Sequence, residues 1–192
     1  MNYAGIRYDD IANGEGIRTT LYVSGCTHKC PDCFSKQTWN FNYGEKFTEE
    51  IRDKIIDSVE EKYYQGITIM GGDPLEDENC DAVLDLILKF RERYSDTKDI
   101  WLYTGWRLED LLKQKVDEVH DSLHAQILMN IDVLVDGPFV KELSDKRLLF
   151  RGSSNQKIYH INTDREKHQI ILVESLLNNK PEKPRPIKVE FR

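Results

Sequence analysis

Three of the four cysteines in this chain, Cys26, Cys30 and Cys33, lie within one short stretch of sequence. A loop of that length can wrap three thiolates around one face of a compact inorganic cofactor. A four-iron cluster usually takes four cysteine ligands. With only three, one iron keeps an open coordination position, which the amino and carboxylate groups of methionine are suited to chelate. The spacing therefore favours a 4Fe-4S cluster with one open iron.

Three other interpretations of these cysteines remain open. His28 could complete a Cys3His zinc site, although structural zinc sites usually draw their ligands from two separated pairs. Cys30 and Cys33 could form a redox dithiol, which needs a thioredoxin-like strand–helix context that Cys26 fits poorly. Unligated core thiols fit least well, because the loop is polar and follows a glycine. Cys80 stands apart near a predicted helix start and is more typical of a small buried residue than of a fourth ligand.

The elements that must position the cysteine loop can be predicted from hydrophobic periodicity. Residues 17–24 are rich in β-branched and aromatic residues and run into Gly25, so the loop should leave the carboxyl end of a strand. Thr48 is a suitable N-cap for a helix whose apolar positions recur as far as Tyr63. The other predicted strands cover 66–74, 100–105, 131–137, 148–152 and 157–161, and the other predicted helices cover 79–93, a stretch beginning near 108, and 118–129.

Strands that alternate with helices imply βαβ crossovers and an α/β fold with a mainly parallel sheet and flanking helices. The carboxyl ends of parallel strands gather at one edge, where ligands bind. The cysteine loop and the Gly71-Gly72-Asp73-Pro74 turn should therefore face one site. The chain is too short for eight βα units, so a complete barrel is not expected. Residues 1–177 are predicted to form a single domain, and the proline-rich residues 178–192 an extended tail.

Composition limits the possible partners and location. The 192 residues carry a net charge of −7, which offers no basic footprint for nucleic acid. Apolar runs are short and interrupted by charges, so no membrane span is expected. The first residues lack the basic start and apolar stretch of a signal peptide. A cytoplasmic, reducing location follows, in which cysteines act as ligands or reactive thiols rather than as disulfides.

The spacing C-x3-C-x2-C is that of the radical SAM enzymes, which this chain resembles. The Gly71-Gly72-Asp73 turn is similar to their GGE-type motif, which holds the methionine ammonium. Residues 14–18 (GEGIR) resemble the GPGIR segment of glycyl-radical-enzyme activating enzymes. Residues 26–39 (CTHKCPDCFSKQTW) are similar to the pattern of one subgroup, the activating enzymes of anaerobic (class III) ribonucleotide reductase. The segments 101–105, 132–139 and 151–156 also resemble this subgroup, so the resemblance covers residues 1–162.

The resemblance implies an incomplete βα barrel of radical SAM type. It further implies that the protein reductively cleaves S-adenosylmethionine at the cluster and removes a hydrogen atom from a glycine of the reductase's glycyl radical subunit. A flavodoxin-like protein would supply the electron. The expected metal ligands are Cys26, Cys30 and Cys33. Residues expected to bind the cofactors are Asp32, Cys33, Phe34, Gly71, Gly72, Asp73, Tyr103, Thr104 and Asp136, with loop capping as the alternative role of Asp136.

The chain also departs from the family pattern. Glu15 stands where the family has proline, and Ser35 where it has asparagine. Asp32 replaces the aromatic residue that is common before the last cysteine, so Phe34 is the candidate apolar surface beside the adenine. His28 could tune the cluster, and Trp39 is expected to pack. Two alternatives stay open: an activating enzyme of another glycyl radical enzyme, and a Cys3His zinc-stabilised binding module without catalysis.

Overall fold

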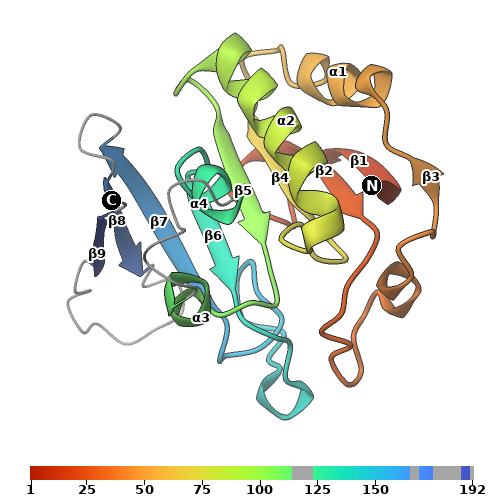
Figure 1. Ribbon diagram of the computed structural model, residues 1–192, viewed down its shortest axis with the longest axis vertical. Helices are drawn as coiled ribbons and strands as arrows, with labels where there is room; N and C mark the ends of the chain where they lie inside the picture. Colours follow the sequence, from red (N-terminus) through yellow and green to blue (C-terminus); the bar gives the residue numbers. More distant parts are fainter. Residues whose placement is uncertain (114–122, 165–168, 175–186, 191–192) are drawn as a thin grey trace.

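A computed structural model describes residues 1–113, 123–164, 169–174 and 187–190. In these ranges the chain forms one nine-stranded sheet with helices packed on it, which is an α/β architecture (Figure 1). The strand order across the sheet is β3-β1-β2-β4-β5-β6-β7-β8-β9. The strands are β1 (Asn2–Asp10), β2 (Ile17–Val23), β3 (Glu45–Lys46), β4 (Tyr64–Gly71), β5 (Asp99–Tyr103), β6 (Val133–Asp136), β7 (Lys157–Asp164), β8 (Gln169–Glu174) and β9 (Ile187–Glu190).

The centre of the sheet is parallel, as the sequence predicts. Strands β2, β4, β5 and β6 pair side by side in the same direction, and helical segments connect them. These helices are α1 (Glu49–Asp57), α2 (Asp77–Tyr94), α3 (Leu108–Lys113) and α4 (Leu123–Leu128), with short 3-10 turns at Lys36–Trp39 and Lys141–Leu143. Figure 1 shows α1, α2 and α4 on one face of the sheet. The carboxyl ends of β2, β4, β5 and β6 therefore gather at one end of the molecule.

Helices α1 and α2 bury the apolar faces that their periodicity indicates. Thr48 caps α1 by accepting a hydrogen bond from the Ile51 amide, and Ile55 and Ile56 are buried. The prediction that this helix continues to Tyr63 is wrong, because α1 ends at Asp57 and Tyr63 is 56 % exposed. Helix α2 buries Val83, Leu84, Leu86, Ile87 and Phe90 against the sheet.

Antiparallel strands flank the parallel centre on both sides, so the complete sheet is mixed rather than mainly parallel. Strand β1, which the sequence analysis does not predict, pairs antiparallel with β2, and β7, β8 and β9 continue antiparallel from β6. The predicted strand at 148–152 is wrong, because Phe150 has φ +56° and only the isolated bridge between Ser144 and Ser153 forms nearby. The left-handed conformation at Phe150 interrupts any extended run.

Three expected features lie partly or wholly outside the residues that the structure describes. The predicted helix at 118–129 is observed as α4, and its first residues lie outside the described part of the chain. The expected domain boundary at residue 177 lies outside it as well. Within the expected tail, Ile187–Glu190 forms β9 and pairs with β8. In the ranges that the structure describes, none of the helices combines the length and the apolar character that crossing a membrane requires.

The two faces of the sheet have different chemistry. The face under the helices carries the main apolar core, which includes Leu21, Val23, Ile67, Ile69, Ile100, Leu102 and Leu134. The opposite face carries a smaller apolar cluster around Trp101, together with the fully buried Arg18. The Arg18 guanidinium donates to Thr68 Oγ1 at 2.8 Å and to the Ile67 carbonyl at 2.7 Å, and it pairs with Asp99. Arg18 is thus committed to the sheet interior rather than to an exposed site.

Candidate functional site

The cysteine loop and the Gly-Gly-Asp turn are hydrogen-bonded to each other where they leave the sheet. The Gly72 amide donates to the Val23 carbonyl at 2.7 Å, and the Asp73 amide donates to the Gly25 carbonyl at 2.8 Å. A Cβ on Gly72 would lie 2.4 Å from that same carbonyl oxygen, so only glycine permits this approach. The ends of β2 and β4 therefore bring the two motifs together, as the sequence analysis predicts.

The cysteine loop is shaped by two tight backbone turns and one buried carboxylate. Lys29 and Asp32 adopt φ values of +45° and +58°, which lets the chain reverse direction between the cysteines. Glu76, which is 6 % exposed, accepts hydrogen bonds from the Thr27 amide at 2.5 Å and from its hydroxyl at 2.8 Å. A charged acceptor makes these bonds stronger than neutral ones. Glu76 thus fixes the loop to the start of α2.

The cysteines themselves are free and half-buried. Burial raises the pKa of the Cys26 thiol to about 11, while the amides of His28 and Lys29 partly offset that effect. Cys33 Sγ accepts a hydrogen bond from the Ser35 amide at 3.4 Å. Backbone N–H groups directed at sulfur stabilise thiolates, and they tune the potential of iron–sulfur clusters. Metal binding at Cys26 would have to displace its proton.

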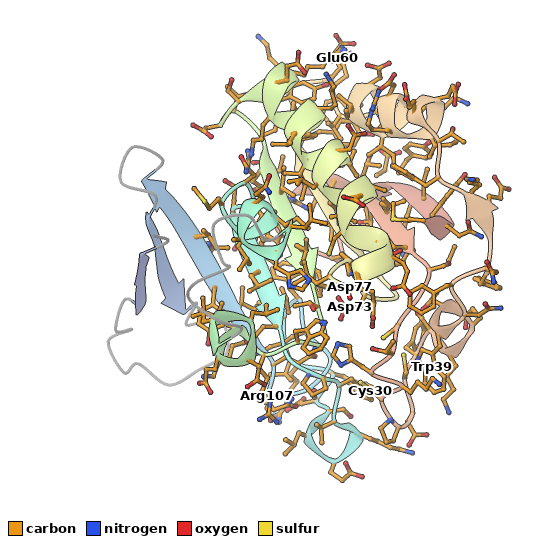
Figure 2. The ribbon with its side chains drawn as sticks, in the orientation of Figure 1. Cys30, Trp39, Glu60, Asp73, Asp77 and Arg107 are labelled. Carbon is orange, nitrogen blue, oxygen red and sulfur yellow. The ribbon has the colours of Figure 1, made fainter. Side chains whose placement is uncertain are left out.

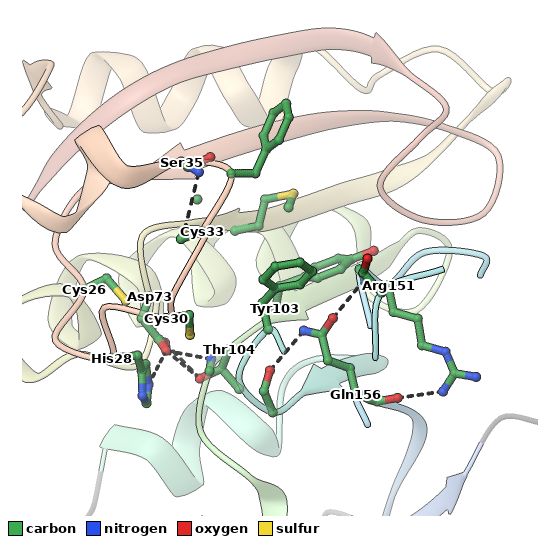
Figure 3. Close-up of a pocket in the computed structure, with 18 of the residues that line it drawn as sticks. Cys26, His28, Cys30, Cys33, Ser35, Asp73, Tyr103, Thr104, Arg151 and Gln156 are labelled. Carbon is green, nitrogen blue, oxygen red and sulfur yellow. Dashed lines mark hydrogen bonds and ion pairs between the residues drawn. The ribbon is translucent and has the colours of Figure 1, made fainter. Parts of the chain in front are cut away.

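Asp73 lies at the centre of the site and is fully buried. Its carboxylate accepts hydrogen bonds from the Leu75 amide at 2.9 Å, from the Thr104 hydroxyl at 2.9 and 3.0 Å, and from the Gly105 amide at 2.8 Å. His28 Nε2 approaches its Oδ2 to 2.9 Å without a well-aligned hydrogen bond (Figure 3). Asp73 therefore connects the ends of β4 and β5 to the cysteine loop.

His28 is positioned by Asp73 rather than by the cysteines. The Asp73 carboxylate raises the pKa of His28 above its ordinary value, against the opposing effect of burial. The His28 ring also meets Trp106 edge to face, with centroids 4.9 Å apart. This arrangement gives the Cys3His zinc interpretation no support, because the ring nitrogen already faces a carboxylate. Across the described ranges, no three His, Cys, Asp or Glu side chains stand close enough together to hold one metal ion.

A cavity of about 690 Å³ opens beside these groups, at the end of the sheet where Figure 2 shows Cys30, Asp73 and Trp39, with Glu60 at the opposite end. All three clustered cysteines line it, and so do both glycines of the Gly-Gly-Asp turn. Figure 3 shows Arg151 and Gln156 across Tyr103 from Cys26. The predicted residues that line the cavity are Cys26, Asp32, Cys30, Cys33, Phe34, Gly71, Gly72, Asp73, Tyr103 and Thr104.

The predicted site residues nevertheless differ in their surroundings. Asp136 is the one that does not line the cavity. Its carboxylate accepts hydrogen bonds from the Leu108 amide at 2.7 Å and the Lys157 amide at 3.2 Å, which is the loop-capping arrangement. Burial raises the pKa of Asp136, and those amides partly offset the effect. Phe34 is fully exposed at the cavity mouth and so is not a core residue.

Asp32 and Tyr103 have surroundings that the sequence analysis does not anticipate. Asp32 pairs with Lys141 at 3.1 Å, which connects the cysteine loop to the segment after β6. Burial raises the pKa of Tyr103 well above its ordinary value, and its hydroxyl has no hydrogen-bond partner in the described part of the chain. Trp39 lines the cavity, and the Lys36 ammonium lies 6.0 Å from its ring centroid.

The sequence analysis did not predict the residues that hold the cysteine loop and the Gly-Gly-Asp turn together, or the loop that closes the cavity. Asn79, fully buried in α2, donates to the Ser24 carbonyl at 3.0 Å and to the Asp73 carbonyl at 2.8 Å. It thereby fastens the strand before the cysteine loop to the turn after β4. A polar residue on the apolar side of α2 was the available signal. The loop between β6 and β7 (residues 137–156), here called the β6–β7 loop, also lines much of the cavity, and the resemblance segments 132–139 and 151–156 were the signs of it.

The donor set fits an iron–sulfur cluster. Three thiols from one loop face a common cavity, amides point at two of the sulfurs, and a glycine turn leaves room for a ligand beside them. Soft thiolates are the ligands that iron–sulfur clusters take in proteins.

Comparison with known proteins agrees with this chemistry. The family model described as "4Fe-4S single cluster domain" matches residues 12–159. The chain is 44 % identical to an anaerobic ribonucleoside-triphosphate reductase-activating protein of Salmonella typhi, over 79 % of this chain and 94 % of that protein. It is 42 % identical to the protein of that name from Escherichia coli K12, over 84 % of this chain and 99 % of the relative.

The protein of the same name from Enterobacteria phage T4 is 38 % identical, over 85 % of this chain and 96 % of the relative. No solved structure matches the chain significantly. The family match spans most of the chain, and these relatives are covered almost completely. The chain therefore belongs to the 4Fe-4S single cluster domain family and, within it, to the anaerobic ribonucleoside-triphosphate reductase-activating proteins.

Proposed function

We propose that this protein is a radical SAM activating enzyme that generates the glycyl radical of an anaerobic ribonucleotide reductase. The observation that carries the proposal is the shared cavity of the three cysteines and the Gly71-Gly72-Asp73 turn. The names of the relatives support the reductase as partner. The parallel strands β2, β4, β5 and β6, with helices on one face, support an incomplete βα barrel of radical SAM type. No observation favours another glycyl radical enzyme as the partner.

Cys26, Cys30 and Cys33 would hold the cluster through three of its irons. When bound, the 4Fe-4S cluster would supply the electron that cleaves the C5′–S bond of S-adenosylmethionine, so that a carbon radical can take a hydrogen atom from glycine. The glycines at 71 and 72 let the backbone approach the methionine end of that molecule. Tyr103 and Thr104 would line the wall beside it, with Asp32 and Phe34 at the mouth. Asp136 would act behind this wall, through the backbone that it caps.

Asp73 would act mainly through what it orients. Its carboxylate already accepts hydrogen bonds from two backbone amides and one hydroxyl, so it fixes the turn that lines the cavity. A negative group at this place also favours a bound ammonium. No acid–base step by the protein is required, and the role of the chain is to bind, orient and exclude water. We further propose a flavodoxin-like electron donor and a cytoplasmic location, which the four free cysteines support.

The test begins with anaerobic purification and iron analysis. About four irons with broad visible absorbance support the cluster, whereas a colourless protein with one zinc contradicts it. The protein is then incubated with a low-potential reductant, S-adenosylmethionine and the reductase. Formation of 5′-deoxyadenosine together with a glycyl electron paramagnetic resonance signal supports the whole proposal. Deoxyadenosine without a glycyl signal retains the cluster chemistry and removes the assigned partner.

A further inference from the structure

The sheet face opposite the helices carries a stack of Arg18, Trp101 and Phe150. The Arg18 guanidinium carbon lies 5.5 Å from the Trp101 ring centroid. The Phe150 ring meets Trp101 edge to face, with centroids 5.3 Å apart at 73°. Arg18 is fully buried, and Trp101 is 1 % exposed. Such aromatic and cation–π contacts favour one arrangement of the rings, so Phe150 rests on a rigid support.

Phe150 also has an unusual backbone. Its φ of +56° lies in the left-handed region, which bulky residues rarely adopt unless their surroundings impose it. Gln156 supplies much of that constraint (Figure 3). Its Oε1 accepts hydrogen bonds from the Gly152 amide at 2.9 Å and the Ser153 amide at 3.1 Å, and its Nε2 donates to the Gly137 carbonyl at 3.0 Å. One side-chain amide thus holds both ends of the β6–β7 loop, and strain of this kind is typical of functional positions.

The register of the sheet shows where Phe150 lies relative to the cysteines. Trp101 pairs with Thr68, whereas Val23, the last residue of β2 before the cysteine loop, pairs with Gly71. Three residues along a strand correspond to about 10 Å. Phe150 lines the same cavity as the cysteines, yet it rests on Trp101 at this lower level. Phe150 therefore forms a wall at a distance from the cysteine end.

We propose that Phe150 positions the glycine-bearing segment of the protein substrate for hydrogen abstraction. This inference rests on the proposed function. A glycine has no side chain to bind, so its backbone must be located by the shape of the surface beside it. An apolar ring on a fixed support offers such a surface, and hydrogen transfer requires reacting atoms about 3–3.5 Å apart. Because the cofactor would occupy the cysteine end of the cavity, the Phe150 end is left for the substrate segment that carries the glycine.

The stoichiometry of the reaction gives a direct measure of positioning. One electron and one S-adenosylmethionine give methionine and a 5′-deoxyadenosyl radical, which takes one hydrogen atom from glycine to give 5′-deoxyadenosine and one glycyl radical. When the glycine is misplaced, the hydrogen atom comes from a thiol or other reductant in the buffer instead. The ratio of deoxyadenosine to glycyl radical then rises above one. This ratio reports on the placement of the substrate.

The experiment uses the iron-loaded protein and the reductase, with Phe150→Ala, Phe150→Gly, Phe150→Leu and Leu149→Ala. Glycine accepts the left-handed backbone, so Phe150→Gly removes the ring without straining the loop. Leu149 is 48 % exposed next in sequence and does not line the cavity, which makes it the matched control. Besides the ratio, we would measure the equilibrium affinity of the oxidised protein for the reductase and for S-adenosylmethionine.

We expect the ratio of deoxyadenosine to glycyl radical to rise about tenfold in both Phe150→Ala and Phe150→Gly, because small misplacements cost large factors in rate. Phe150→Leu should recover most of the coupling, and Leu149→Ala should resemble the wild type. Affinity for the reductase should fall severalfold, while affinity for S-adenosylmethionine stays within about twofold. An unchanged ratio, or weaker S-adenosylmethionine binding alone, overturns the role of Phe150. A wild-type protein that forms no deoxyadenosine overturns the proposed function itself.

Discussion

Asp73→Asn is a nearly isosteric change at the centre of the site, and its effect on stability can be worked out from the contacts of the carboxylate. Oδ1 accepts from the Leu75 amide, Oδ2 accepts from the Gly105 amide, and the Thr104 hydroxyl bonds to both oxygens. An asparagine can keep only one of these oxygens. The new NH₂ group must then face a backbone N–H, and two donors cannot bond to each other.

The magnitude follows from the hydrogen bonds that are lost. A hydrogen bond to a charged group contributes about 1.5–3 kcal/mol, and a buried donor left without a partner costs about 1–3 kcal/mol. The Thr104 hydroxyl can rotate to accept from the new amide, which recovers part of this loss. We expect Asp73→Asn to lower the free energy of unfolding by about 2–4 kcal/mol. That is a large fraction of the stability of an ordinary domain.

The assay is urea unfolding of the reduced, cluster-free chain, followed by circular dichroism. With a urea m-value of about 2 kcal/mol/M, the midpoint should fall by about 1–2 M at unchanged slope. Asp77→Asn is the matched control, because Asp77 is exposed in the first turn of α2, four residues after Asp73, and should contribute only about 0.3–1 kcal/mol through the helix dipole. Figure 2 labels both carboxylates.

A midpoint shift in Asp73→Asn no larger than that of Asp77→Asn would refute the reasoning. It would mean that water enters the turn and satisfies its donors. In that case the view of Asp73 as the group that connects β4, β5 and the cysteine loop would have to be abandoned.

Three further predictions concern other parts of the chain. Cys30→Ala should lose most of the bound iron, whereas Cys80→Ala should retain it, as measured by iron analysis after anaerobic reconstitution; iron loss in the second variant would contradict the ligand assignment. Asn79→Leu removes hydrogen bonds to two buried carbonyls, of which that of Asp73 keeps a bond from the Glu76 amide, and should lower the unfolding free energy by about 1–3 kcal/mol in urea. Burial raises the pKa of Asp10, but hydrogen bonds from Thr20 and two other donors outweigh it, so the net pKa is lowered. The stabilisation that Asp10 gives the folded chain is therefore present above about pH 4 and lost as the pH falls further. In Asp10→Asn the free energy of unfolding should depend less on pH in this range, and a pH dependence parallel to that of the wild type would contradict this expectation.

The parts of the fold that the sequence predicts well are those with continuous apolar strands. The β-branched residues of β2, β4, β5 and β6 require burial on the sheet, and glycines or turn residues follow each of them. Because parallel strands must have their carboxyl ends together, the meeting of the cysteine loop with Gly72 could also be predicted. The hydrogen bond from the Gly72 amide to the Val23 carbonyl confirms that prediction.

The remaining errors have particular physical causes. Strand β1 carries few apolar residues, so its residue pattern does not predict a strand. It is stabilised instead by its pairing with β2. The segment 148–152 has strand-like residue types, yet Phe150 has a left-handed conformation within a loop that the Gln156 side chain ties to the distant Gly137. The contacts of Glu76 and Asn79 join elements far apart in the sequence, and no local pattern encodes them. Tertiary hydrogen bonds decided each of these cases.

The way in which the cysteine loop is attached has a consequence for the maturation of the protein. The Gly25 amide bonds to the Thr38 carbonyl and the Cys26 amide to the Trp39 carbonyl, so both ends of the loop are tied beside each other at the base. The part of the loop beyond the Thr27 contact with Glu76 can therefore open locally while β2 stays paired with β4. Amides between these ties should exchange with deuterium well before those of the central strands. Iron and sulfide could then enter a chain that is already folded, and assembly of the cluster would be a separate, later event than folding.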